Sequence, residues 1–168
     1  MPNFNKPHDS MRGYLAYYLH KEMEANKDIW LVYADLGYKQ WDAIIEDFPD
    51  RCINCGAAEQ AGMGLCIGLA LEGKIPFFYS ITNFSLYRTF EWVRNYVDYE
   101  QIPVKILGAG RDKTYENDGY THQSEDCKQV LKCFPNITSY FPDDKEDIEK
   151  LLHTIINNNK PVFISLTK

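Results

Sequence analysis

Apolar residues in this chain fall into two kinds of stretch that alternate from one end to the other. A continuous apolar run, typical of a buried strand, occurs at 29–34, and further strands are predicted at 52–53, 76–80, 104–107, 137–140 and 162–166. Between them, apolar residues return every three or four positions. This spacing predicts helices over 11–26, 41–46, 84–100, 124–133 and 143–157, and one more around Glu59.

The alternation of strands and helices predicts an α/β fold. We expect a three-layer sandwich in which a mostly parallel sheet has helices on both faces. Residues 10–168 are expected to form this single domain, and residues 1–9 a loose N-terminal arm. Ligands of such sheets bind beyond the carboxyl ends of the strands, where Asp35, the 80–84 segment and the 108–122 loop are predicted to lie.

The charge and composition exclude several classes of protein. The 168 residues carry a net charge of −6, so the chain lacks the basic surface that neutralises nucleic-acid phosphates. A hydrophobic content of 45% is that of a globular domain. No apolar run has the length of a membrane span or the form of a secretion signal, which leads us to expect a cytoplasmic protein.

An odd number of cysteines without a secretion signal favours free thiols. The five are Cys52, Cys55, Cys66, Cys127 and Cys133. Cys52 and Cys55 form a Cys-x-x-Cys pattern, which occurs in zinc and redox sites. A second pair at ligand spacing is missing, so we interpret both residues as small buried side chains.

Glu59 is the most unusual residue of the chain, because it lies in a run of small and apolar residues, one turn into a predicted helix. A carboxylate in such a helix is costly unless a specific partner binds it. The alternative is a residue of the first turn that only complements the helix dipole. Residues downstream favour a specific role.

Three downstream segments follow Glu59 in a recognisable order: residues 76–80, 81–94 and 117–126. Residues 81–94 combine aromatic side chains with an Arg-x-x-Glu-x-x-Arg pattern, and residues 117–126 contain Asp-Gly-x-Thr-His-Gln. Together with 35–37 and 48–54, this order resembles the pyrimidine-binding domain of transketolases and is similar to the matching domain of deoxyxylulose-phosphate synthases. The resemblance runs over residues 11–166.

The resemblance implies a thiamine diphosphate-binding fold of the pyrimidine-binding type, and thiamine diphosphate as the cofactor. It assigns Glu59 to the pyrimidine ring, where its carboxylate favours the imino tautomer that activates the cofactor. Phe84 and Tyr87 would wall the ring, and Asp35 is expected among the cofactor-binding residues. For Phe84 and Tyr87 the alternative is an aromatic stripe packed in the core.

The same resemblance implies that Asp118 and His122 contact the substrate, with His122 as a proton-transferring group. The alternative is a loop aspartate followed by a helix-capping histidine. Gly110 stands where transketolases usually have a phosphate-binding histidine, which separates the chain from ordinary sugar-phosphate specificity. Arg111 could instead meet an anionic substrate. We expect the Arg-x-x-Glu-x-x-Arg residues to be structural.

The 168 residues contain no Gly-Asp-Gly and asparagine pattern of the kind that holds Mg²⁺ against the cofactor's diphosphate, and no segment that resembles the third domain of ordinary transketolases. We therefore expect a separate diphosphate-binding subunit that carries the Mg²⁺. The chain is expected to self-associate and to form an α2β2 assembly with that partner.

We expect the assembled enzyme to cleave a C–C bond and transfer a two-carbon unit from a keto sugar or keto acid. One alternative is a subunit of a thiamine diphosphate-dependent 2-keto acid decarboxylase or acyloin synthase. A second is a non-catalytic binding module.

Overall fold

A computed structural model describes residues 6–167. The part of the predicted arm that covers residues 1–5 lies outside the described residues. At the end of the arm, Asp9 forms an ion pair with Lys145. The Ser10 side chain then caps the first helix by accepting a hydrogen bond of 3.1 Å from the backbone N–H of Gly13. The arm therefore contacts the domain before the first helix begins.

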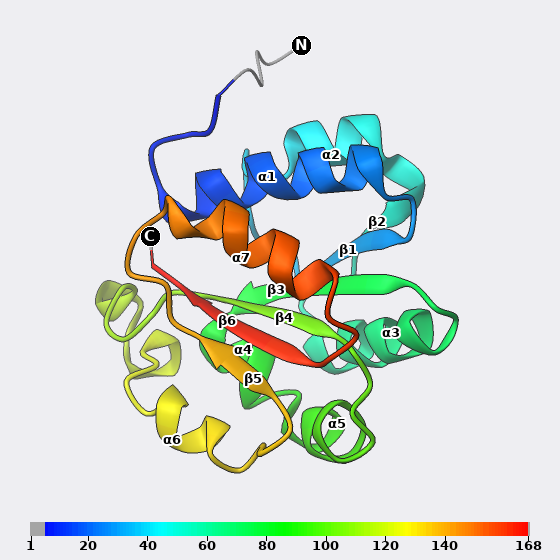
Figure 1. The fold of residues 1–168 in the computed structure, drawn as a ribbon. Helices are drawn as coiled ribbons and strands as arrows, with labels where there is room; N and C mark the ends of the chain where they lie inside the picture. The colour runs from blue at the N-terminus through cyan, green and yellow to red at the C-terminus, as the bar shows by residue number, and fades with distance from the viewer. Residues whose placement is uncertain (1–5, 168) are drawn as a thin grey trace.

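The described residues form one six-stranded sheet in the order β2-β1-β3-β4-β6-β5, and every neighbouring pair is parallel (Figure 1). The sheet is thus wholly parallel where a mostly parallel one was predicted. The strands are β1 (Ile29–Tyr33), β2 (Cys52–Asn54), β3 (Ile75–Ile81), β4 (Lys105–Ala109), β5 (Thr138–Tyr140) and β6 (Val162–Leu166).

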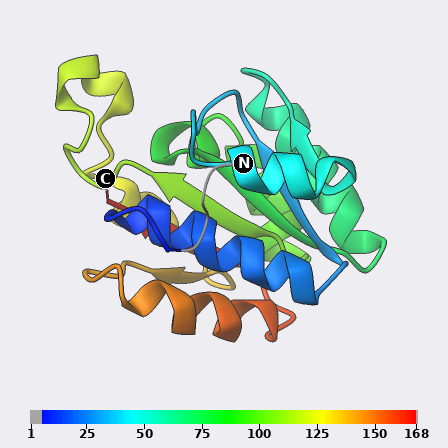
Figure 2. The same cartoon turned by 90° about the horizontal axis from the view of Figure 1, so that it is seen from above.

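Helices cover both faces of the sheet, as predicted (Figures 1 and 2). One face carries α1 (Met11–Ala25), α2 (Asp42–Asp47) and α7 (Asp147–Ile156). The other carries α3 (Glu59–Leu71), α4 (Thr82–Leu86), α5 (Phe90–Trp92) with the π-helical segment Val93–Tyr99, and α6 (Cys127–Leu131). Three 3-10 turns complete the described chain: Pro49–Arg51, Glu116–Asp118 and Tyr120–His122.

The central strands are buried on both faces, and this explains why most of their residues are apolar. Successive side chains point to opposite sides of the sheet. Phe77 and Tyr79 of β3 accordingly pack under α1 and α7, whereas Phe78 between them packs against α3. The two cores so formed fix α3 on one layer and α1 on the other.

The predicted single helix over 84–100 is wrong. The chain turns helical directly after β3 at Thr82, breaks at residues 87–89 and continues as α5 and the π-helical segment. Buried hydroxyl groups contribute to the break: Thr89 donates to the carbonyl of Ser85 at 2.5 Å, and Ser85 donates to the carbonyl of Thr82. Such back-bonding from serine and threonine bends helices.

Three other helix boundaries also differ from the prediction. The helix of Glu59 begins at Glu59 itself and not one turn earlier. The helix predicted over 124–133 is limited to Cys127–Leu131, and the one predicted from 143 begins at Asp147. None of these three helix starts has a side-chain cap.

Candidate active site at the carboxyl edge of the sheet

The segments with the candidate residues meet at one edge of the sheet. The strand order reverses at β1, because the chain passes outward to β2 and then returns to β3 on the other side. Asp35 follows β1, α3 follows β2, α4 follows β3, and the 110–123 loop follows β4. The carboxyl edge at such a reversal is where α/β sheets bind ligands.

Glu59 is the first residue of α3 and is only 4% exposed. Ala58 before it offers no side-chain cap, so the carboxylate lies at an uncapped helix start where the dipole favours a negative charge. Nη1 of Arg88 donates to both carboxylate oxygens, at 2.9 and 3.0 Å. This arginine satisfies the buried charge in the described structure.

Arg88 also stacks on Phe84. Its guanidinium carbon lies 3.5 Å from the centroid of the Phe84 ring. The two residues are four positions apart, across the end of α4, so the same face carries both. Phe84 further makes an edge-on contact with His122, with ring centroids 5.0 Å apart. The structure thus brings Glu59, Phe84 and His122 into one continuous set of contacts through Arg88.

Asn83 ties α4 to the 110–123 loop. Its side-chain amide donates to the backbone carbonyls of Thr121 and Gln123, at 3.0 and 2.6 Å. His122 lies between these two acceptors, and its Nδ1 is 3.0 Å from the hydroxyl of Thr121. The amide oxygen of Asn83 is buried without a protein partner. Asn83 therefore positions the histidine.

Tyr87 lies in the break after α4. Its hydroxyl donates a hydrogen bond of 2.5 Å to Asp126, next to the start of α6, and its ring packs against the core on the α3 side of the sheet. Burial raises the pKa of Tyr87 well above its ordinary value, and the hydrogen bond to Asp126 is the second cause of this rise. These contacts anchor Tyr87 between helices, and its role at the cofactor stays a prediction.

Asp35 is exposed at the end of β1 and has a positive φ of 46°. Its carboxylate accepts from the side-chain amide of Asn54, and its backbone N–H donates to the same asparagine, both at 3.1 Å. Asn54 also accepts from the backbone N–H of Gly56. The pairing links the ends of β1 and β2 and holds Asp35 at the edge that carries Glu59.

Asp118 ends a 3-10 turn and is exposed. Gly119 follows with a φ of 85°, a conformation that favours glycine, and the next 3-10 turn ends at His122. The Asp-Gly-x-Thr-His-Gln sequence thus forms two consecutive tight turns. Asp118 and His122 are presented from the same loop.

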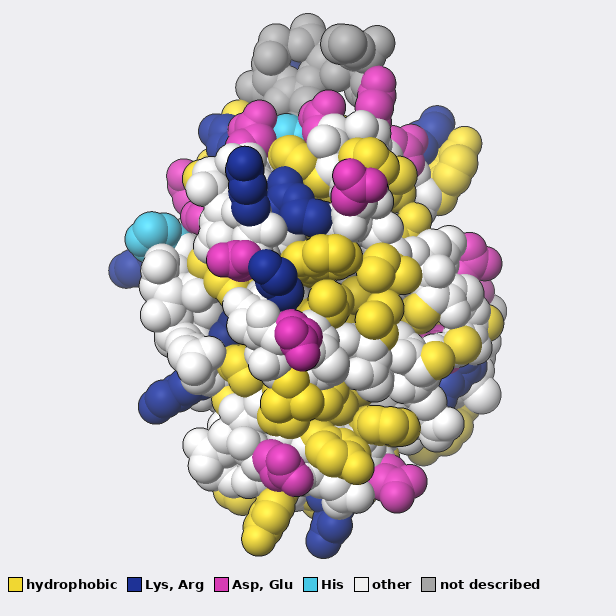
Figure 3. All heavy atoms as spheres, turned by 90° about the vertical axis from the view of Figure 1, so that its right-hand side faces the viewer, with side chains coloured by type: hydrophobic (Ala, Val, Ile, Leu, Met, Phe, Trp, Pro, Cys, Tyr) yellow, Lys and Arg dark blue, Asp and Glu magenta, His cyan; other side chains and the backbone are white. Residues whose placement is uncertain are grey.

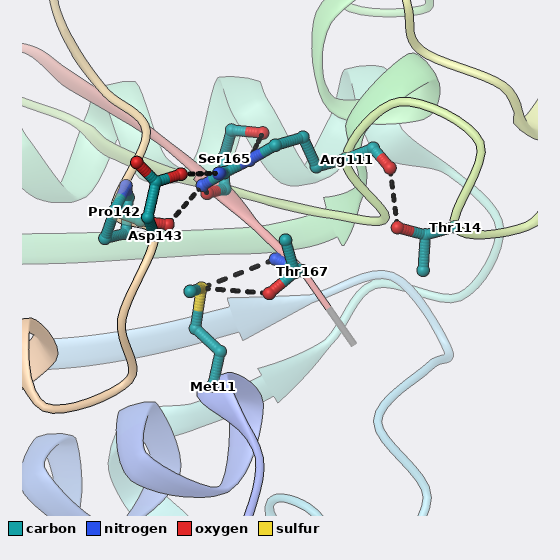
Figure 4. A network of polar contacts seen from close by, with 7 residues as sticks. All are labelled: Met11, Arg111, Thr114, Pro142, Asp143, Ser165 and Thr167. Carbon is teal, nitrogen blue, oxygen red and sulfur yellow. Dashed lines mark hydrogen bonds and ion pairs between the residues drawn. The ribbon is translucent and has the colours of Figure 1, made fainter.

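Arg111 has a different setting from the one predicted (Figure 4). Arg111 is only 8% exposed. Its guanidinium donates hydrogen bonds to the carboxylate of Asp143, to the carbonyl of Pro142, and to both the hydroxyl and the carbonyl of Ser165. Thr114 additionally bonds the carbonyl of Arg111. Arg111 joins β6 to the 142–143 segment, which favours a structural role over contact with an anionic substrate.

A pocket of about 440 Å³ opens beside the start of α1. Its lining includes the basic side chains of His8, Arg12 and Lys39. Nη1 of Arg12 donates to the hydroxyl of Tyr115 at 3.1 Å, while its Nε is buried without a protein partner. Gly110 packs against the ring of Tyr115, where a Cβ would lie 2.2 Å from the nearest carbon. A larger residue at position 110 would displace this tyrosine.

The Cys-x-x-Cys pair has the properties of packing residues. Burial raises the pKa of Cys52 to about 11 and also raises that of Cys55, so both are thiols near neutral pH. Within residues 6–167, no group of three or more His, Cys, Asp or Glu side chains is placed to hold a metal ion. In the same range, every helix is too short or too polar to span a membrane.

Sequence reasoning missed two residues of this site. It assigned Arg88 to a structural ion-pair face, although its spacing from Phe84 could have indicated that the two share a surface. It assigned no role to Asn83, whose partners are backbone carbonyls of a loop 38 and 40 positions away. A bond to backbone leaves no pattern in the side chains of that loop.

A six-stranded parallel sheet with helices on both faces is the fold of transketolase pyrimidine-binding domains, as comparison with known proteins shows. The chain matches the family model of the transketolase pyrimidine-binding domain over residues 9–168. It therefore belongs to the family of transketolase pyrimidine-binding domains.

Among relatives, the chain is 33% identical over 123 residues to the 6-deoxy-6-sulfo-D-fructose transketolase subunit SqwH of Clostridium sp. (strain MSTE9). It is 34% identical over 122 residues to a subunit of the apulose-4-phosphate transketolase of Actinobacillus succinogenes. Each match covers 73% of this chain, but 38% and 39% of the relatives. The chain thus spans well under half the length of these proteins.

A solved structure described as a split gene transketolase, inactive beta4 tetramer, superposes with a TM-score of 0.82 at 28% identity. The match covers 94% of this chain and 51% of that one.

Proposed function

We propose that this chain is the pyrimidine-binding part of a two-chain, thiamine diphosphate-dependent transketolase-like enzyme. The observation that carries the proposal is the nearly complete burial of the Glu59 carboxylate at the start of α3. A buried carboxylate is expensive without a specific partner. Arg88 pairs it in the described structure, and family membership supplies a second partner of the right kind, the pyrimidine ring of the cofactor.

The residues around Glu59 fit a flat heteroaromatic ring. The carboxylate can accept a hydrogen bond from the ring edge, and Phe84 offers a face for stacking. Because Glu59 is buried, such a hydrogen bond is strengthened by the low local dielectric. Thiamine diphosphate, when bound, supplies the stabilisation of a carbanion equivalent that C–C cleavage requires. Glu59 polarises the ring, and Phe84 and Asp35 help to orient it.

His122 and Asp118 act on the substrate in this proposal. An imidazole accepts a proton as a base and, once protonated, donates it as an acid, so His122 can transfer a proton to or from the substrate. Its place against Phe84 sets it beside the surface on which the ring would stack. Asp118 on the adjacent turn can accept a hydrogen bond from a substrate hydroxyl.

The substrate is a keto compound from which a two-carbon unit is transferred. The pocket with His8, Arg12 and Lys39 lies at the same edge of the sheet and could take an anionic end of that substrate. The tight packing of Gly110 against Tyr115 supports the alternative of a 2-keto acid decarboxylase or acyloin synthase, since it excludes a phosphate-binding histidine at position 110.

The partner in this proposal is a diphosphate-binding chain that carries the Mg²⁺. Large hydrophobic side chains remain exposed on the α3 side of the domain: Leu65, Leu71, Tyr96 and Tyr99. Hydrophobic side chains also gather across the middle of the face in Figure 3. Such surfaces mark interaction sites. The similar protein solved as a beta4 tetramer supports self-association. With the partner, the proposed assembly is α2β2.

Calorimetry with thiamine diphosphate and Mg²⁺ tests the proposal. We expect weak binding by this chain alone and tight binding by the chain mixed with a candidate diphosphate-binding chain. The mixture is then assayed with ketose phosphates and with pyruvate to separate transferase from decarboxylase. Tight Mg²⁺-dependent binding by this chain alone would refute the two-chain proposal, and no binding by the mixture would favour the non-catalytic binding module.

A further inference from the structure

Arg88 occupies the two surfaces that a ring ligand needs. Its Nη1 bonds both carboxylate oxygens of Glu59, and its guanidinium plane covers the ring of Phe84 at 3.5 Å. A guanidinium is flat, delocalised and rich in N–H donors. It therefore presents to Glu59 and Phe84 the same kind of edge and face that an aminopyrimidine would.

A ring that stacks on this face of Phe84 while bonding Glu59 cannot coexist with Arg88 in its present position. We propose that Arg88 is a placeholder: it fills the pyrimidine site in the cofactor-free chain and leaves Glu59 when the cofactor binds. This inference rests on the proposed function and adds to it a competition between a side chain of the protein and the cofactor.

Arg88 is the member of the group that can move. The Glu59 side chain is 4% exposed and fixed at the start of α3, whereas the Arg88 side chain is 47% exposed. Arg88 also lies in the break at residues 87–89, outside both flanking helices. A half-exposed arginine can turn its charged end into water while its stem stays on the surface.

The exchange explains how the chain tolerates Glu59 before the enzyme is complete. Without Arg88, the free chain would hold a buried carboxylate that no side chain pairs, which is strongly destabilising. With Arg88, the cofactor must displace an existing interaction. Its apparent affinity is then reduced by the fraction of molecules in which Arg88 covers the site.

The first experiment measures the pair in the cofactor-free chain by urea unfolding. We expect Arg88→Met to lower the unfolding midpoint, and to lower it far less in a chain that also carries Glu59→Gln. Arg94→Met is the matched control. Arg94 is exposed in the π-helical segment that follows the break, and among the contacts described it bonds only its neighbour Asn95. Equal effects of Arg88→Met in both backgrounds would overturn the proposal.

The second experiment uses the assembled two-chain enzyme and calorimetry with thiamine diphosphate and Mg²⁺. We expect Arg88→Met to bind the cofactor on the order of fivefold or more tightly than the wild type, the low end of typical coupling between two linked events. Arg94→Met should bind as the wild type does.

The outcomes separate the inference from the proposed function. Equal or weaker binding by the Arg88→Met enzyme, with normal wild-type binding, would overturn the placeholder and leave the function standing. Absence of binding by the wild type, Arg94→Met and Arg88→Met alike would overturn the proposed function and the placeholder together.

Discussion

Gly62 of α3 lies so close to Phe78 of β3 that a Cβ atom on the glycine would stand 2.8 Å from the phenylalanine ring. The same Cβ would lie 2.6 Å from the sulfur of Cys55. Real side chains avoid such distances. The contact brings the first turn of α3 down onto the sheet and so fixes the depth at which Glu59 is buried.

Substituting this glycine tests the contact directly. We expect Gly62→Ala to destabilise the chain by about 1–3 kcal/mol through overpacking, although alanine favours helices. Gly68→Ala on the same helix is the control, since Gly68 is exposed and a Cβ there would meet no atom within 4 Å, and it should stabilise by up to about 1 kcal/mol. Urea unfolding measures both. Similar stability changes for the two variants would contradict the close packing.

Glu59→Gln tests the role of the buried carboxylate. The amide retains the size and one acceptor but removes the charge that polarises the cofactor ring, so turnover of the two-chain enzyme should fall on the order of 10²-fold or more. Glu72→Gln at the other end of α3 is exposed and should leave turnover unchanged. Steady-state assays of the two variants measure this turnover. Near-normal turnover with Glu59→Gln would mean that the carboxylate only complements the helix dipole.

Arg111→Met distinguishes a structural arginine from a substrate contact. The substitution leaves the carbonyls of Pro142 and Ser165 without a donor, and we expect a loss of about 2 kcal/mol in unfolding free energy. KM of the assembled enzyme should stay unchanged. Lys113→Met, an exposed neighbour, should change neither quantity. A large rise in KM with unchanged stability would restore the substrate role.

Lys105 should make stability depend on pH. Burial lowers the pKa of Lys105 to about 8 from its ordinary value near 10.5. Between these two values the unfolded chain binds more protons at Lys105 than the folded chain does. The contribution of Lys105 to stability therefore rises with pH across this window and is least favourable below pH 8.

Comparison with Lys105→Met isolates this effect. The unfolding free energy of the wild type minus that of Lys105→Met should increase on the order of 2 kcal/mol from pH 7.5 to pH 10. The ammonium of Lys105 also donates to the side chain of Asn158 and to the carbonyl of Lys160, and these bonds favour the charged form and so oppose the effect of burial. A flat difference for Lys105→Met would show that its ammonium is adequately solvated.

The layered architecture was predictable because the strands carry their own signal. The apolar runs at 76–80, 104–107 and 162–166 coincide with β3, β4 and β6, which are buried on both faces. The break after α4 was not predictable from periodicity, since Ser85 and Thr89 fit a helical pattern and act through hydroxyl bonds to the backbone.

Within the site, Glu59 was recognisable as a charge among apolar residues. Arg88 was not, because a sequence gives no means of telling a surface arginine from one whose guanidinium reaches a buried carboxylate 29 positions away. The setting of Arg111 was hidden for a similar reason. Two of its partners are the backbone carbonyls of Pro142 and Ser165, and these exist whatever side chains the sequence supplies.

The hydrogen bonds from Asn83 to Thr121 and Gln123 link α4 rigidly to the 110–123 loop. Phe84 belongs to α4 and His122 to the loop. If Phe84 faces the cofactor and His122 the substrate, any displacement of one is transmitted to the other through a side chain that touches neither ligand. A substitution in this loop that alters which substrate is accepted would then also alter how tightly the cofactor is bound. A second substitution near Phe84 would be needed to restore cofactor binding.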